Sequence, residues 1–368
     1  DAPAPNLASR TLELLCVGGA SWFLLPLAWA LERGLGLDRA ELAIGFLMFH
    51  GAHVINDPHF AVTYVLFYRG WKRRWSGGEL GLLDRVRHVF AGVLVPLLLA
   101  GWIGFALVTG SAPALGALIQ GMFLLVGWHY VKQGYGVLSV LSARRGRSFS
   151  AGERRILLAH CFASWAYAWA SPPDAGTILE EKGVVYTSFA HSASLERCAG
   201  VVLALSTLAL IACLIRKWRS ERRTPPLGPL AVFLTTVWLW TIASSIDPLL
   251  IYMIPALHSI QYLYFVGLMR WNQARAHEGA PHFGPTARSR LLGLFLGAVA
   301  LGYVLFHGLP ELLDGAIFRP SLRHPRPLTD LGTTPFFAAF FTFVNIHHYF
   351  MDNVIWRRSN PETRFLSR

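Results

Sequence analysis

Long apolar runs recur along the whole chain, and short polar or basic stretches separate them. Most runs reach the roughly 20 residues that a helix needs to cross the hydrocarbon core of a bilayer. We therefore predict an all-α polytopic membrane protein with about ten transmembrane helices, forming a single transmembrane helical domain over residues 1–368. The ten predicted segments are 11–31, 40–67, 87–109, 112–141, 155–171, 198–215, 228–246, 248–269, 291–309 and 333–356.

The connection between the seventh and eighth segments decides whether the chain crosses ten times or nine. Residues 245–248 form either a tight hairpin or the bend of one helix. Basic residues follow every second segment, such as Arg69 and Lys72 after the second and Arg144 after the fourth. Nine crossings would break this alternation, so we expect ten. Because basic residues accumulate in cytoplasmic loops, both termini are predicted to be cytoplasmic, in a bacterial inner (cytoplasmic) membrane.

The composition agrees with a membrane protein. Hydrophobic residues make up 54% of the chain and charged residues 15%, whereas soluble domains carry about 25% charged residues. This argues against a water-soluble enzyme and against a nucleic-acid partner. The net charge of +12 is therefore interpreted as a signal of orientation in the membrane.

The histidines are the second unusual feature of the chain. Seven of the 14 histidines fall on four predicted segments that run in the same direction. The basic residue that marks the end of each segment lies 9 to 15 positions after its last histidine, with His348 to Arg357 the shortest interval and His129 to Arg144 the longest. At about 1.5 Å per residue, the four places lie at a similar depth. The sequence thus predicts one shared site inside the membrane.

Ionisable residues at this depth are costly and usually functional, although any single histidine can also be a hydrogen-bonded core residue. Neutral imidazoles with a carboxylate suit iron, zinc or copper. The predicted metal ligands are His50, His53, His59, His129, His258, His347, His348 and Asp352. Because this set exceeds what one ion needs, we expect two ions.

Polar residues near these histidines are predicted to assist the site. Asp57, Gln133, Gln261 and Asn345 are expected to orient the ligands and the cofactor. Asp352, Lys132 and Tyr349 are the candidate catalytic residues, with the alternatives that Lys132 and Asp352 form a buried ion pair and that Tyr349 only packs.

Local spacing connects two of these residues and suggests where the helix bends. His53 and Asp57 are four residues apart and share a helix face. Pro58 is expected to disrupt the helix just before His59. The remaining histidines are weaker candidates: His160 is a reserve ligand, whereas a solvated or interfacial role is expected for His88, His191, His277, His282, His307 and His324.

These histidine motifs resemble those of the histidine-rich integral-membrane di-iron oxygenases, the family of fatty-acid desaturases, hydroxylases and alkane monooxygenases. The resembling residues are His50-Gly51-Ala52-His53, His59, His129 and His347-His348. The resemblance implies a membrane-embedded oxidoreductase with two iron ions that oxidises a lipid-like substrate with O₂, using electrons from a cytoplasmic donor. The spacing of the first pair is HxxH here and HxxxH in that family.

Two other functions are compatible with the same residues. One is an intramembrane zinc hydrolase that acts on a lipid amide or ester through a metal-bound water. The other is a non-enzymatic haem-binding, pigment-binding or transport subunit. In the enzymatic cases, the expected partners are a hydrophobic membrane-soluble substrate and the surrounding membrane lipids.

Overall fold

The computed structural model describes residues 7–72, 80–172, 174–245, 247–318 and 331–366. Nearly all of these residues are helical, as the apolar runs predict. The described part departs from an all-α fold at one short antiparallel hairpin, which pairs β1 (Ile178–Glu181) with β2 (Val184–Thr187).

The helices follow one another with short connections. The first half contains α1 (Leu7–Leu14), η1 (Leu15–Gly19), α2 (Ser21–Leu35), α3 (Leu37–Ala52), α4 (Asn56–Tyr68), α6 (Leu82–Val89), η2 (Phe90–Leu94), α7 (Val95–Thr109), α8 (Ala112–Arg144) and α9 (Ala151–Ala170). The second half contains α10 (Ala193–Glu221), α11 (Leu227–Leu234), η3 (Thr235–Ile242), η4 (Ala243–Ser245), α12 (Pro248–Arg275), α13 (Ala287–Tyr303), η5 (Val304–Gly308), α14 (Leu309–Leu313), η6 (Asp314–Phe318), α15 (Pro335–Ile355) and η8 (Pro361–Leu366).

Within the described residues, six helical stretches are long and apolar enough to cross a membrane, as expected of an integral membrane protein. They are Leu82–Thr109, Ala112–Arg144, Ala193–Glu221, Leu227–Ser245, Leu249–Arg275 and Ala287–Ile317. A seventh candidate is the pair Arg10–Gly19 and Ser21–Leu35, whose two halves are inclined by 52°. The predicted seventh and eighth segments are thus two separate helices. By these criteria the described residues contain fewer spans than the ten predicted.

The predicted second segment, 40–67, is two helices and not one. The helix breaks at residues 53–55, between α3 and α4. Pro58 lies in the first turn of α4, where a missing N–H breaks no helical hydrogen bond. The break therefore precedes the position predicted from Pro58.

The predicted tenth segment forms α15, which is not among these six stretches because it carries several polar residues. It can carry them because it lies inside the bundle. It packs against α4, α7 and α8, and its polar residues Asn345, His348 and Asp352 are buried. A helix that protein surrounds on most sides does not need an apolar surface all round. Hydropathy alone therefore undercounts the helices of the core.

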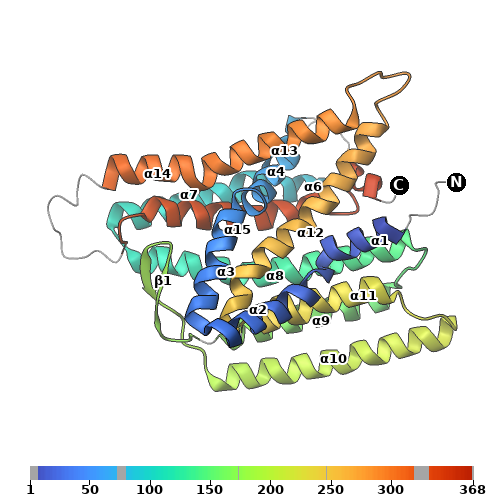
Figure 1. Cartoon of the computed structure of the whole chain (residues 1–368), viewed down its shortest axis with the longest axis horizontal. Helices are drawn as coiled ribbons and strands as arrows, with labels where there is room; N and C mark the ends of the chain where they lie inside the picture. The colour runs from blue at the N-terminus through green and yellow to red at the C-terminus, as the bar shows by residue number, and fades with distance from the viewer. Residues whose placement is uncertain (1–6, 73–79, 173, 246, 319–330, 367–368) are drawn as a thin grey trace.

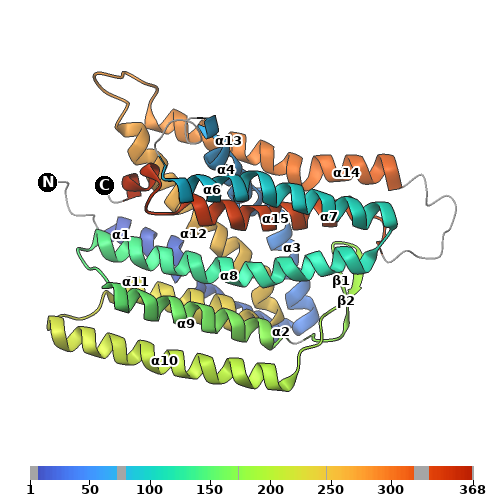
Figure 2. The same ribbon diagram turned by 180° about the vertical axis from the view of Figure 1, so that it is seen from behind.

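The connections fall at two ends of the bundle (Figures 1 and 2). In both views α1 and η8 lie at the same end as the connections from α8 to α9, from α10 to α11 and from α12 to α13. The β1–β2 hairpin and the connection from α7 to α8 lie at the opposite end. The connections with many basic residues, such as Arg144 and Arg145, thus share one end.

The largest hydrophobic core joins four of the helices that carry predicted ligands. Val62 of α4, Val137 of α8, Tyr262 of α12 and Met351 of α15 are all buried in it. The lateral contacts of α15 with α4 and α8, and of α4 with α12, bring these helices together. Any polar group on their facing sides must therefore find its partners inside the protein.

Candidate metal centre

Four buried histidines from four helices converge in this core, and we call them the four-histidine group. They are His59 of α4, His129 of α8, His258 of α12 and His348 of α15. One ring nitrogen of each lies within 4.8 Å of one ring nitrogen of every other. Their exposed fractions are between 0 and 4%, so the protein surrounds the group on all sides.

The spacing of the donor atoms fits a metal coordination shell. The Nε2 atoms of His129 and His258 are 3.1 Å apart. Oδ2 of Asp352 lies 3.3 Å from Nε2 of His348 and 3.8 Å from Nε2 of His129. Ligands bound to one ion at about 2.0–2.1 Å lie about 3–3.5 Å from one another. An ion among these atoms therefore requires only small movements of the side chains.

The rings also contain nitrogens that no protein atom satisfies. Nε2 of His59, Nδ1 of His258 and both ring nitrogens of His348 are buried without a hydrogen-bond partner. Each unsatisfied buried polar atom costs about 1–3 kcal/mol. A metal ion in the group would satisfy Nε2 of His59 and one nitrogen of His348, so the donor set fits a metal better than it fits a packed core.

A serine sets the orientation of His59. The Ser259 hydroxyl donates to Oδ1 of Asn56 at 2.9 Å and lies 3.1 Å from Nδ1 of His59. Because its proton is used on Asn56, the hydroxyl oxygen accepts a hydrogen bond from Nδ1–H of His59. Nε2 of His59 then has a free lone pair and faces the group, which is the form that binds a metal.

A second hydrogen-bonded chain holds Asp352. The Tyr262 hydroxyl donates to Oδ1 of Asp352 at 2.7 Å, and Oγ1 of Thr63 lies 2.7 Å from that hydroxyl. This arrangement fixes one carboxylate oxygen on α12 and leaves Oδ2 directed at His129 and His348. Asp352 can thus serve as a fifth ligand or hold a proton beside the ion.

Four other predicted site residues surround the group without facing its centre. Tyr349 stacks on His129 with ring centroids 4.8 Å apart, and its hydroxyl donates to Oδ1 of Asn345 at 3.0 Å. Gln133 donates to Oε1 of Gln261 at 2.8 Å, which ties α8 to α12. The contacts of Tyr349, Gln133 and Gln261 join helices that carry the ligands, whereas the hydrogen bond between Tyr349 and Asn345 lies within α15.

Three predicted ligands, His347, His50 and His53, lie away from the four-histidine group, and His53 belongs to a second set described below. His347 is next to His348 but points elsewhere, since consecutive residues of a helix differ by about 100°. Its Nδ1 lies 3.0 Å from the Tyr64 hydroxyl and its Nε2 lies 3.0 Å from the Ala91 carbonyl oxygen. Both nitrogens therefore have protein partners. His50 is exposed on α3 and contacts Phe46 of the same helix.

The alternative pairing of Lys132 with Asp352 is not formed in the described part of the chain. Lys132 lies half-buried on α8, one turn after His129. Asp352 has three other partners nearby, namely His129, His348 and Tyr262. These contacts occupy the carboxylate and leave the lysine outside the site.

A second set of candidate ligands, the three-residue group, contains His53, Asp57 and His307. Oδ2 of Asp57 is 2.9 Å from Nε2 of His307 and 3.6 Å from Nδ1 of His53. The sequence pattern favoured a solvated or interfacial role for His307 and so missed its contact with Asp57. No local pattern links residues 250 positions apart, and only the packing of α13 on α4 reveals the contact.

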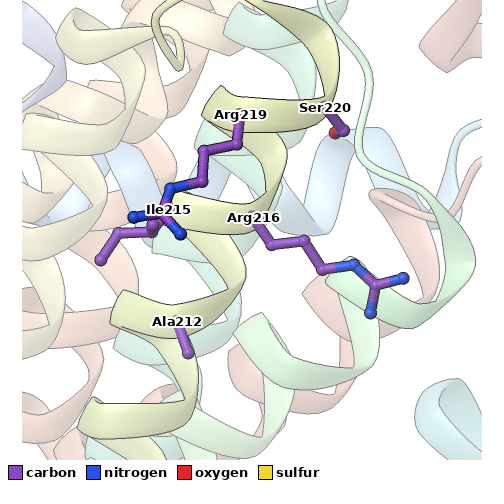
Figure 3. A pocket seen from close by; sticks show the side chains of 5 residues that line it. All are labelled: Ala212, Ile215, Arg216, Arg219 and Ser220. Carbon is purple, nitrogen blue, oxygen red and sulfur yellow. The ribbon is translucent and has the colours of Figure 1, made fainter.

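None of the other histidines in the described residues joins either group. The reserve ligand His160 lies on α9, where its Nδ1 is 3.1 Å from Oγ of Ser206 on α10. His324 lies outside the described residues. A hollow on the surface of α10 is lined by Ala212, Ile215, Arg216, Arg219 and Ser220 (Figure 3). It shares no residue with the two groups.

Comparisons with protein-family models, with curated proteins and with solved structures find no match to this chain. Function is therefore inferred from the geometry and chemistry of the site.

Proposed function

We propose that this protein is an integral-membrane metalloenzyme that binds one iron ion in the four-histidine group and uses O₂ to oxidise a hydrophobic substrate of the membrane. One observation carries the proposal. Four buried imidazoles converge beside a buried carboxylate, and several of their nitrogens have no partner in the protein.

The number and type of donors favour iron. Zinc in proteins is almost always four-coordinate, and catalytic zinc keeps one of its four positions for water. Four imidazoles and Asp352 offer five donors, which suits a six-coordinate ion with one open position. Imidazole and carboxylate are also accepted ligands of iron.

We propose one ion here and not a two-ion cluster, because only part of the predicted ligand set shares one cavity. Two-metal sites hold their ions about 3.5–4 Å apart. Asp57 and His59 are two residues apart on α4 and therefore point about 200° apart around its axis. The two groups lie on different sides of this helix.

The residues around the ion have distinct tasks. Bound iron supplies the activation of O₂. Ser259 keeps Nε2 of His59 available as a ligand, and Tyr262 holds Asp352 with one oxygen directed at the rings. The Thr63–Tyr262–Asp352 chain can hold and move a proton at the carboxylate. The rings of Tyr349 and Tyr130, against His129 and His258, form apolar walls.

Oxidation of one C–H bond with insertion of one oxygen atom also reduces the second oxygen atom to water, which takes two electrons and two protons. We propose that a separate cytoplasmic donor supplies the electrons. The end of the bundle with the basic connections would face the cytoplasm by the positive-inside rule, with α1 and η8 on that side.

The zinc hydrolase is the second candidate, and one observation favours it. Oδ2 of Asp352 faces the group at 3.3 Å from His348, where a carboxylate could accept a proton from a metal-bound water. Haem binding is less favoured, because four ring nitrogens within 4.8 Å of one another leave no space for a porphyrin.

Elemental analysis of the purified protein in detergent tests the proposal. We expect one tightly held iron per chain in the wild type, and its loss in His258→Ala. His347→Ala is the matched control, because this buried histidine already has protein partners for both nitrogens. Zinc alone, haem absorbance, or equal iron in His258→Ala and the wild type would each overturn the assignment.

A second readout tests the open coordination position. Nitric oxide, an analogue of O₂, should bind the ferrous protein and produce an electron paramagnetic resonance signal. The signal should be absent from His258→Ala and present in His347→Ala. Absence of the signal from the iron-loaded wild type would contradict an O₂-dependent reaction.

A further inference from the structure

We propose that the three-residue group is a second metal site, which holds an exchangeable divalent transition-metal ion independently of the four-histidine group. Its ligands are His53, Asp57 and His307, each of which offers one donor atom within 4.8 Å of the others. The site goes beyond the proposed function, since the four-histidine group does not need it.

Irregular helix geometry brings the three residues together. His53 lies in the break between α3 and α4, and Asp57 lies in the first turn of α4. His307 lies in η5, a π-helical turn that follows α13. Turns of this kind inside helices occur frequently at functional sites. Here the turn rotates the His307 ring towards α4.

A glycine permits the close approach of the two helices. A Cβ atom at Gly302 would lie 2.8 Å from the carbonyl carbon of Asp57 and 2.9 Å from its Cβ. Any side chain at this position would push α13 away from α4. The contact between His307 and Asp57 therefore depends on Gly302, which is five residues away on the same helical stretch.

The distances fit coordination better than a set of hydrogen bonds. Oδ2 of Asp57 is 2.9 Å from His307 and 3.6 Å from His53. The second distance is too long for a hydrogen bond, yet both agree with the ~3–3.5 Å between ligands of one ion. The two imidazole rings are also held with centroids 4.3 Å apart. Two protonated rings would repel each other there, whereas two neutral rings can share a cation.

The donor set indicates the class of ion. Two histidines and one carboxylate form the ligand set of non-haem ferrous sites and of several catalytic zinc sites, all of which keep open positions. The His53 side chain is 36% exposed and that of His307 is 19% exposed. Three ligands and this exposure predict an ion that chelators remove easily, in contrast to the buried one.

Cobalt(II) titration of the full-length protein in detergent, after mild chelation, tests the second site. We expect the wild type to take up one Co²⁺ reversibly, with visible absorption that reports its ligands. His53→Ala and His307→Ala should each weaken this uptake at least 10-fold. Asp57→Asn should do the same, but this buried residue contacts α13, so the more exposed His53 provides the safer variant.

Two control variants establish whether the Co²⁺ uptake belongs to the three-residue group. Glu196→Gln removes an exposed carboxylate of α10 that belongs to neither group and should leave Co²⁺ uptake unchanged. His348→Ala should lose the tightly held ion of the four-histidine group and keep the exchangeable one. Failure of the proposed function would thus leave the Co²⁺ result intact. Unchanged uptake in both His53→Ala and His307→Ala, or no uptake by the wild type, would overturn the second site.

Discussion

The two histidine groups lie on different sides of α4 and differ in how the protein surrounds them. The four-histidine group is closed, with rings between 0 and 4% exposed and nitrogens without partners. The three-residue group is open, and its carboxylate already accepts a hydrogen bond from His307. An ion could satisfy the partnerless nitrogens of the closed group, whereas the open group already has hydrogen-bond partners within the protein. We therefore expect the buried four-histidine group to bind its metal ion tightly and the more exposed three-residue group to exchange its metal ion readily.

The largest expected effect is the difference in iron binding between substitutions of His348 and of its neighbour His347. His348→Ala removes a ligand from the closed group and should weaken iron binding by more than the 10–100-fold that loss of an outer partner typically causes. His347→Ala should retain iron, because the His347 ring of the wild type is hydrogen-bonded to Tyr64 and Ala91 and does not face the group. Metal content after gel filtration measures both. Equal loss in the two variants would mean that the closed group responds to general damage of α15.

The next effect concerns the serine that orients His59. Ser259→Ala should lower the iron affinity about 10–100-fold, since an outer partner sets the ring tautomer. Ser206→Ala is a matched control, because Ser206 also contacts a histidine, His160, at 3.1 Å but outside both groups. Competition with a chelator measures the affinities. Identical affinities would show that Ser259 does not hold the ligand.

A glycine substitution tests the close packing of α13 on α4 beside the three-residue group. Gly302→Ala should destabilise the fold by about 1–3 kcal/mol, as overpacking usually does, and should weaken Co²⁺ uptake by the three-residue group. Gly297→Ala on the same helix places its methyl in open space, so no such loss is expected. Thermal unfolding in detergent compares them. A Gly302→Ala variant as stable as Gly297→Ala would contradict the close packing of α13 on α4.

The smallest effect is expected at His50. His50→Ala should change the free energy of unfolding by less than about 0.5 kcal/mol and should leave both metal contents unchanged, because this ring is exposed and belongs to neither group. Metal analysis and thermal unfolding provide the check. Loss of either ion would mean that His50 of α3 belongs to the group that binds that ion.

Part of the site could be predicted from residue order alone. The spacing between the histidines and the basic residues at the ends of their segments predicts that histidines of four segments lie at one depth. His59, His129, His258 and His348 do meet. The same spacing cannot separate His347 from His348, because depth along a helix does not specify which way a side chain points. His307 was missed for a related reason, since its partner Asp57 is 250 residues away.

The order of apolar and polar residues was enough to predict a nearly all-α fold with long apolar helices, because burial of the backbone in an apolar medium requires continuous apolar runs to be helical. It also predicted that histidines from several segments share one site, as His59, His129, His258 and His348 do. The break at residues 53–55, the interior position of α15 and the division of the histidines into two groups emerged only in three dimensions. These features depend on rotation and lateral packing of the helices, which contacts such as Gly302 against Asp57 control.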